Sequence, residues 1–74
     1  MKYSKKIQHR VSRIEGQVGG VKRMIANDSD EEKVMTQLLA VISSLESLKL
    51  ELIRKQMKDS LVEDVRKSLG LSDS

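Results

Sequence analysis

The sequence RVSRIEGQVGGVKRM, residues 10–24, combines an apolar seam with a basic flank on one predicted helix. The apolar residues recur at spacings of four and three, the heptad pattern of helices that pack along their length. The same spacing continues on both sides of the stretch and gives the seam Ile7, Val11, Ile14, Val18, Val21 and Ile25. It predicts a helix over residues 4–26. Gly16, Gly19 and Gly20 each oppose that helix by about 1 kcal/mol relative to Ala. A close approach by another helix or by a phosphate backbone is the expected compensation.

The basic flank lies beside this seam. On a helical wheel of about 100° per residue, five polar residues fall within about 80° of one another, and Glu15 lies on the other side. These five are the candidate DNA-binding residues Lys2, Lys6, Arg10, Arg13 and Gln17. Arg can fork onto phosphates or guanine edges, and Gln can pair with adenine.

A solvated face that serves only solubility is the alternative for this flank. Residues 1–26 hold seven Lys or Arg residues and one acid, whereas residues 27–47 hold one Lys and five acids. A surface that is merely soluble usually mixes charges of both signs. The separation of charge therefore favours a nucleic-acid partner.

The composition limits the other classes of function. The 74 residues include no Cys, which excludes disulfides and thiolate metal sites, and a single His, so we expect no enzyme. No apolar run approaches the roughly 18 residues of a membrane span, and the N-terminus carries charges, so we expect a cytoplasmic protein with no membrane contact. So short a chain has room for one domain, over residues 1–74. A core of Leu, Ile, Val and Met without Phe or Trp favours an all-α fold.

Two further helices are predicted after a break at residues 27–30, NDSD. Ser29 with Glu32, and later Ser60 with Glu63, have the Ser-x-x-Glu spacing of a capping box at a helix start. We therefore predict a long helix over residues 30–58 and a short one over residues 61–69, which ends at Gly70.

The long helix determines the predicted architecture. It carries two apolar rows, one through Val34, Leu38 and Val41 and a second through Met35 and Ile42. Two other helices cannot cover so wide an apolar arc. We expect the three-helix protomer to form an antiparallel helical dimer, with a dimer of dimers as a further step.

The pattern R-V-x-R-I-E-G-Q-V-x-G-V-x-R-M-I at residues 10–25, followed by T-Q-L-x-A-V at residues 36–41, resembles the copper-sensing operon repressor family. Nickel/cobalt-responsive and formaldehyde-responsive repressors belong to the same family. The resemblance implies an all-α, disc-like homotetramer, a dimer of dimers, that binds operator DNA through basic residues of its first helix and releases it when an effector binds. It places Arg10 at a DNA-binding position. A second DNA-linked arginine of the copper sensors falls on Ser47, so its contribution is either absent or supplied by Lys49.

The sensing positions of the family do not keep their ligands. In the family these positions carry a Cys, a His and then a second Cys or His. The resemblance aligns them with Glu31, Gln56 and Ser60, which are vestigial effector-site positions here. Their oxygens are poor donors for Cu(I) or Ni(II), so we expect no metal cofactor, although family members bind Cu(I), Ni(II) or Co(II). We hypothesise that Glu31 and Gln56 of neighbouring subunits meet in this pocket, bonded to each other or holding a polar ligand. A weak hard-metal site of Glu31 with the neighbouring Asp28, Asp30 and Glu32 is a further alternative.

Three functions remain open at this stage. The first is a DNA-binding repressor whose inducer is neither a soft metal nor an electrophile. The second is a constitutive family member, or a partner subunit for a ligand-binding paralogue. The third is a helical assembly module whose basic face meets an acidic protein or a membrane surface.

Overall fold

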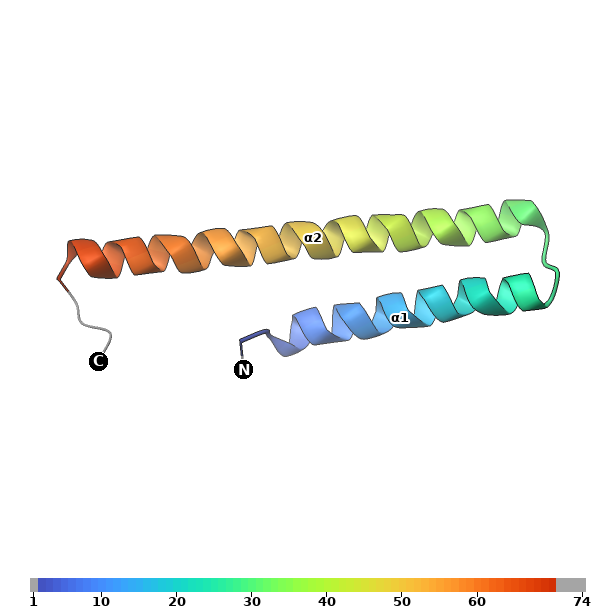
Figure 1. Cartoon of the computed structure of the whole chain (residues 1–74), viewed down its shortest axis with the longest axis horizontal. Helices are drawn as coiled ribbons and strands as arrows, with labels where there is room; N and C mark the ends of the chain where they lie inside the picture. The colour runs from blue at the N-terminus through green and yellow to red at the C-terminus, as the bar shows by residue number, and fades with distance from the viewer. Residues whose placement is uncertain (1, 71–74) are drawn as a thin grey trace.

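Two antiparallel helices make up the computed structural model, which describes residues 2–70 (Figure 1). Helix α1 spans Lys5–Ala26 and helix α2 spans Glu31–Ser68. Ser4 caps α1, since its side-chain oxygen accepts a hydrogen bond from the backbone N–H of Ile7 at 3.2 Å. No strand occurs in the described part of the chain, which confirms the predicted all-helical class.

The turn between the helices is a Schellman motif that ends α1. Asp28 adopts a left-handed conformation with φ 53°. Its N–H donates to the carbonyl of Ile25 at 3.2 Å, and the N–H of Ser29 donates to that of Met24 at 2.9 Å. The break at residues 27–30 is thus where the sequence predicted it. The capping box was wrong, because the backbone of Ser29 closes α1 while Asp30 takes the N-cap position of α2.

The predicted third helix was also wrong, because α2 continues through Ser60 to Ser68 without interruption. A capping box starts a helix only where the preceding backbone has left the helical conformation. Neither Gly nor Pro interrupts residues 31–69, and Lys55 forms an ion pair with Asp59 one turn before that point. The predicted end is confirmed, since Gly70 follows the C-cap Leu69 with φ 72°.

Few apolar side chains are buried in this hairpin. Among the described residues the buried core consists of Ile7, Ile14 and Val41. The chain exposes 6310 Å², whereas a compact monomeric protein of this length exposes about 4,600 Å². Its radius of gyration is 18.7 Å, against about 11 Å for a compact domain of this length. The single chain is therefore a flat, elongated unit of 61 × 19 × 12 Å with its apolar surface largely uncovered.

Nine of the exposed apolar residues lie on one side of the hairpin. On α1, Val11 and Val18 lie on one flank of the buried row that contains Ile7 and Ile14, and the exposed apolar row of α2 lies on the same flank of Val41. Because the helices are antiparallel, these two flanks face the same way. We call this surface the apolar face; it consists of Val11, Val18, Ile25, Met35, Leu38, Ile42, Leu45, Ile53 and Met57. The apolar seam predicted for α1 is thus divided between the contact with α2 and this face.

Candidate nucleic-acid interface

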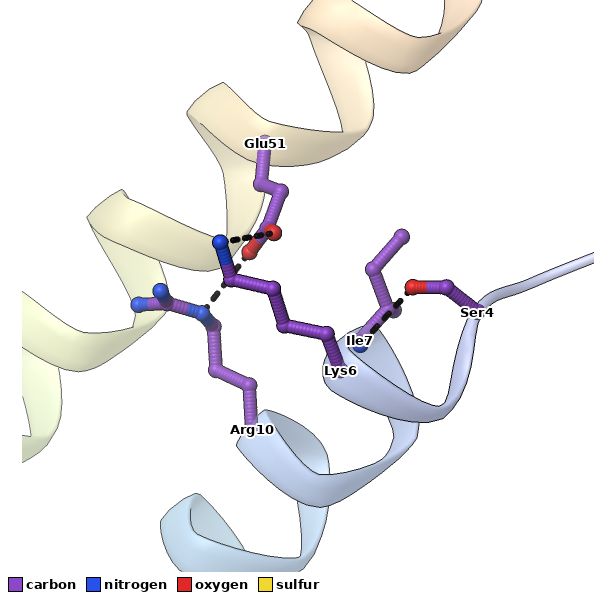
Figure 2. Close-up of polar contacts among 5 residues, drawn as sticks. All are labelled: Ser4, Lys6, Ile7, Arg10 and Glu51. Carbon is purple, nitrogen blue, oxygen red and sulfur yellow. Dashed lines mark hydrogen bonds and ion pairs between the residues drawn. The ribbon is translucent and has the colours of Figure 1, made fainter.

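Arg10 and Glu51 join the two helices on the side opposite the apolar face (Figure 2). Arg10 Nε of α1 lies 2.8 Å from Glu51 Oε2 of α2, and the two side chains are 29% and 21% exposed. The Nε–H bond does not point at the oxygen, so this contact is an ion pair without hydrogen-bond geometry. Lys6 Nζ lies 3.9 Å from the other carboxylate oxygen, but the Lys6 side chain is 76% exposed and solvent screens that pair.

A shallow hollow surrounds this pair and includes residues of both helices. Lys6 and Arg10 come from α1, and Ser47, Leu50, Glu51 and Arg54 come from α2. Lys6, Arg10 and Arg54 therefore place three cationic side chains around one carboxylate.

A second hollow continues along the same side of the hairpin. Arg10, Arg13 and Gln17 line it from α1, together with Ser44 from α2. Oε1 of Gln17 is buried without a hydrogen-bond partner among the described residues. We call the combined surface the cationic face; it consists of Lys6, Arg10, Arg13, Gln17, Ser44, Ser47 and Arg54.

The structure brings four of the five predicted DNA-binding residues together and separates the fifth. Lys6, Arg10, Arg13 and Gln17 lie on the cationic face. Lys2 precedes α1, so its position on a helical wheel has no meaning, and its Nζ lies 5.7 Å from the centre of the Tyr3 ring.

Sequence reasoning missed Glu51 and Arg54 on this surface. Lys49, suggested as a substitute for the arginine missing at Ser47, instead lies 2.9 Å from Glu46. It does not line either hollow, whereas Arg54 shares one with Ser47. Glu51 and Arg54 lie on the same side of the α2 helical wheel as Ser44 and Ser47. That shared side is the one sequence signal that could have indicated them. The register between the helices, which brings that flank to Arg10, is not encoded in any local pattern.

The vestigial effector-site positions are exposed in the single chain. Glu31 opens the first turn of α2, while Gln56 and Ser60 lie one turn apart near its other end. Gln56 and Ser60 line a hollow with Lys2, Tyr3, Leu52, Lys55 and Asp59. Glu31 and Gln56 are separated by about 38 Å at 1.5 Å per residue, so they can meet only between two chains. That pairing stays a prediction.

Acidic side chains do not converge within this chain. Residues 2–70 contain no group of three or more His, Cys, Asp or Glu side chains placed to hold a metal ion. Asp28, Asp30, Glu31 and Glu32 belong to that range, so the hard-metal site suggested for them is not formed within one chain. In the same range, no helix combines the length and the hydropathy that crossing a bilayer requires.

Comparison with known proteins identifies the family. The family model described as metal-sensitive transcriptional repressor matches residues 3–73. The chain belongs to this family. The metal-sensitive repressors are regulators of transcription rather than enzymes, which confirms the expectation that this chain is not an enzyme. The copper-sensing transcriptional repressor RicR of Mycobacterium tuberculosis is a relative, 44% identical over 48 residues. The match covers 65% of this chain and half of RicR, and no solved structure matches.

The residues present do not fit the metal that the name of RicR implies. Cu(I) prefers thiolate and imidazole ligands, and this chain has no Cys and a single His. That His9 lies in α1 and is exposed, far along the chain from Gln56 and Ser60. A carboxylate, an amide and a hydroxyl at Glu31, Gln56 and Ser60 offer no soft donor. The family membership and the donor set therefore disagree at the sensing positions.

Proposed function

We propose that this chain is a transcriptional repressor that binds operator DNA through its cationic face. The observation that carries the proposal is the separation of two surfaces on one thin hairpin. Arg10, Arg13 and Gln17 cluster on one side, and exposed apolar residues such as Val18 and Ile42 occupy the other. A hairpin with two such surfaces can bind phosphates on one side while the other side packs against protein.

The apolar face gives the proposal its oligomeric form. Each chain exposes about 1,700 Å² more than a compact protein of its length, so two chains together carry an excess of about 3,400 Å², within the range that obligate homodimers bury. A second copy of the chain would cover the apolar face and repeat the cationic face through a two-fold axis. The repeated cations would multiply the phosphate contacts, because each neutralised phosphate releases counterions. The dimer, and the dimer of dimers that the family resemblance implies, belong to this proposal.

The effector of this repressor is proposed to be neither a soft metal nor a thiol-reactive electrophile. The chain contains no Cys, and its vestigial effector-site positions carry Glu31, Gln56 and Ser60. Such oxygen and amide groups suit a polar ligand held by hydrogen bonds. Addition of Cu(I) or Ni(II) should leave the protein bound to DNA, as measured by fluorescence anisotropy of a labelled duplex. Release of DNA by micromolar Cu(I) would show that a soft site exists elsewhere in the assembly.

Two alternative functions follow from the same features. A constitutive repressor, or a partner subunit for a ligand-binding paralogue, is favoured by the missing sensing ligands. A module that meets an acidic protein or a membrane surface is favoured by the exposed cations alone. A module of the latter kind should bind any polyanion, with no preference among DNA sequences.

The test compares DNA sequences at one fixed, moderate salt concentration. The full chain is first used to enrich a duplex from a randomised library, and its affinity for that duplex is compared with its affinity for a scrambled duplex of equal length. Arg13→Ala should weaken binding to the enriched duplex by about tenfold, the size of one charge-assisted contact. Lys49→Ala is the matched control, because it removes one positive charge from a residue already paired with Glu46. Equal affinity of the wild-type chain for both duplexes would refute the repressor function.

A further inference from the structure

Glu51 is an acid in the middle of a cationic surface. Its carboxylate lies 2.8 Å from Arg10 Nε and 3.9 Å from Lys6 Nζ, and its side chain is 21% exposed. A surface that served only to attract phosphates would bind DNA more tightly without the negative charge of Glu51. The presence of Glu51 therefore needs a different explanation.

The geometry of Arg10 supplies that explanation. Glu51 contacts the guanidinium at Nε, and in Figure 2 the two terminal nitrogens lie away from the carboxylate. Among the described residues neither terminal nitrogen takes part in a hydrogen bond or ion pair. Their N–H groups form the end of the guanidinium fork, which can reach a guanine edge or a phosphate with two parallel hydrogen bonds. The ion pair thus keeps the Nε end of the Arg10 side chain beside Glu51 and leaves the terminal nitrogens open.

We propose that Glu51 is a positioning residue: it holds Arg10 through Nε, presents the terminal fork of Arg10 to DNA, and so sets sequence selectivity at the expense of overall affinity. The inference rests on the proposed DNA-binding function and deepens it. Selective contacts require a guanidinium in one fixed place, because a fork that swings freely meets many sequences equally well. Sequence-independent contacts need only positive charge.

The two effects of Glu51 have opposite signs, and this makes them separable. Removal of its charge should release Arg10, which lowers selectivity. The same removal should leave Lys6 and Arg10 without an internal counter-charge, which strengthens sequence-independent binding. A loss of structure would weaken both kinds of binding together.

Glu51→Gln in the full chain tests the proposal against the enriched and scrambled duplexes. The ratio of the two affinities should fall by about tenfold, the discrimination given by one well-formed bidentate contact. Affinity for the scrambled duplex should be unchanged or higher, with a steeper dependence on salt. Glu46→Gln is the matched control, because it removes the same charge from a carboxylate that is 60% exposed and paired with Lys49. Its affinity ratio should equal that of the wild type.

A double-mutant cycle decides whether Glu51 acts through Arg10. In an Arg10→Ala background, Glu51→Gln should change the affinity ratio no further. Circular dichroism and light scattering on each variant should give the wild-type helicity and particle mass. An unchanged ratio in Glu51→Gln, an equal fall in the Arg10→Ala background, or a joint loss of helicity and of binding to both duplexes would each overturn the positioning role. Absence of selectivity in the wild-type chain would instead overturn the proposed function, and the inference with it.

Discussion

Gln37 of α2 donates a hydrogen bond from its side-chain Nε2 to the backbone carbonyl oxygen of Gln17 of α1, over 3.2 Å. The amide crosses α1 beside Gly20, where a Cβ atom would lie 3.1 Å from Nε2. Gly20 thus gives room to a side chain of α2 that bonds to the backbone of α1. The expectation that a glycine of the first helix permits close approach is met at Gly20 by a side chain of α2.

Gly16 and Gly20 should respond differently to substitution by Ala. A Cβ at Gly16 meets nothing within 4 Å in the single chain, so Gly16→Ala should stabilise the protein by about 0.5–1 kcal/mol through helix propensity. Gly20→Ala gains the same propensity but displaces the Gln37 amide, which costs about 1 kcal/mol for the lost hydrogen bond. The two variants should therefore differ by about 1 kcal/mol in the free energy of unfolding.

Urea denaturation followed by circular dichroism at equal protein concentration measures that difference. Gln37→Ala supplies the control, since Gly20→Ala should then recover the gain seen at Gly16. A Gly16→Ala variant that is less stable than wild type would mean that another chain lies against Gly16 in the assembly.

Ser4 and Ser60 test the two-helix architecture. Ser4 accepts a hydrogen bond at the N-cap of α1, so Ser4→Ala should cost about 1 kcal/mol of stability. Ser60 lies inside α2, so Ser60→Ala should be neutral or stabilise the protein by about 0.5 kcal/mol. Thermal denaturation followed at 222 nm compares both variants with the wild type. A cost at Ser60 equal to that at Ser4 would place a helix start there and restore the three-helix protomer.

The sequence predicted the helices where local chemistry alone determines them. The first helix, the break at residues 27–30 and the stop at Gly70 each depend on residues within one or two turns, and each lies where it was predicted. The false helix start at Ser60 shows the limit of this reasoning, because a capping pattern inside a continuous helix is indistinguishable from one at its beginning. Stability of the helix across that point depends on neighbours such as Lys55 and Asp59.

The candidate site was only partly predictable, for a different reason. Arg10, Arg13 and Gln17 lie on one helix, so a wheel was sufficient to group them. Glu51 and Arg54 come from the second helix, and their proximity to Arg10 depends on how the two helices align along their length. That alignment follows from tertiary packing and from the length of the turn, which no single-helix periodicity describes.

Arg54 should contribute to DNA binding although no motif indicated it. It shares a hollow with Lys6 and Arg10 from the other helix, so its cation adds to the field that attracts phosphates. Arg54→Ala should weaken binding to enriched and scrambled duplexes alike, by several-fold at low salt. It should also lower the slope of log affinity against log salt by about one, the loss of roughly one phosphate contact.

Anisotropy titrations over a range of salt concentrations give both quantities for Arg54→Ala. Lys49→Ala is again the control, with one charge fewer on the same helix and no place on the cationic face. If both variants have the same slope as wild type, phosphates do not approach the C-terminal half of α2.

The apolar face should hold the assembly together, and α1 offers a matched pair of positions to test it. Val18 is 50% exposed on the apolar face, and Ser12 is exposed on the outer side of the same helix. Val18→Glu places a charge where a second copy would pack, and desolvation of that unpaired charge costs several kcal/mol. The variant should sediment as a monomer and lose much of its helicity, because one chain buries few apolar residues.

Ser12→Glu adds the same charge and should keep the wild-type particle mass and helicity. Analytical ultracentrifugation at several micromolar concentrations measures the mass, and circular dichroism on the same samples measures the helix content. A Val18→Glu variant with wild-type mass would show that the copies meet through a different surface. Dissociation by both variants would mean that α1 is covered on two sides, and would direct the search for a second interface to the outer side of α1 around Ser12.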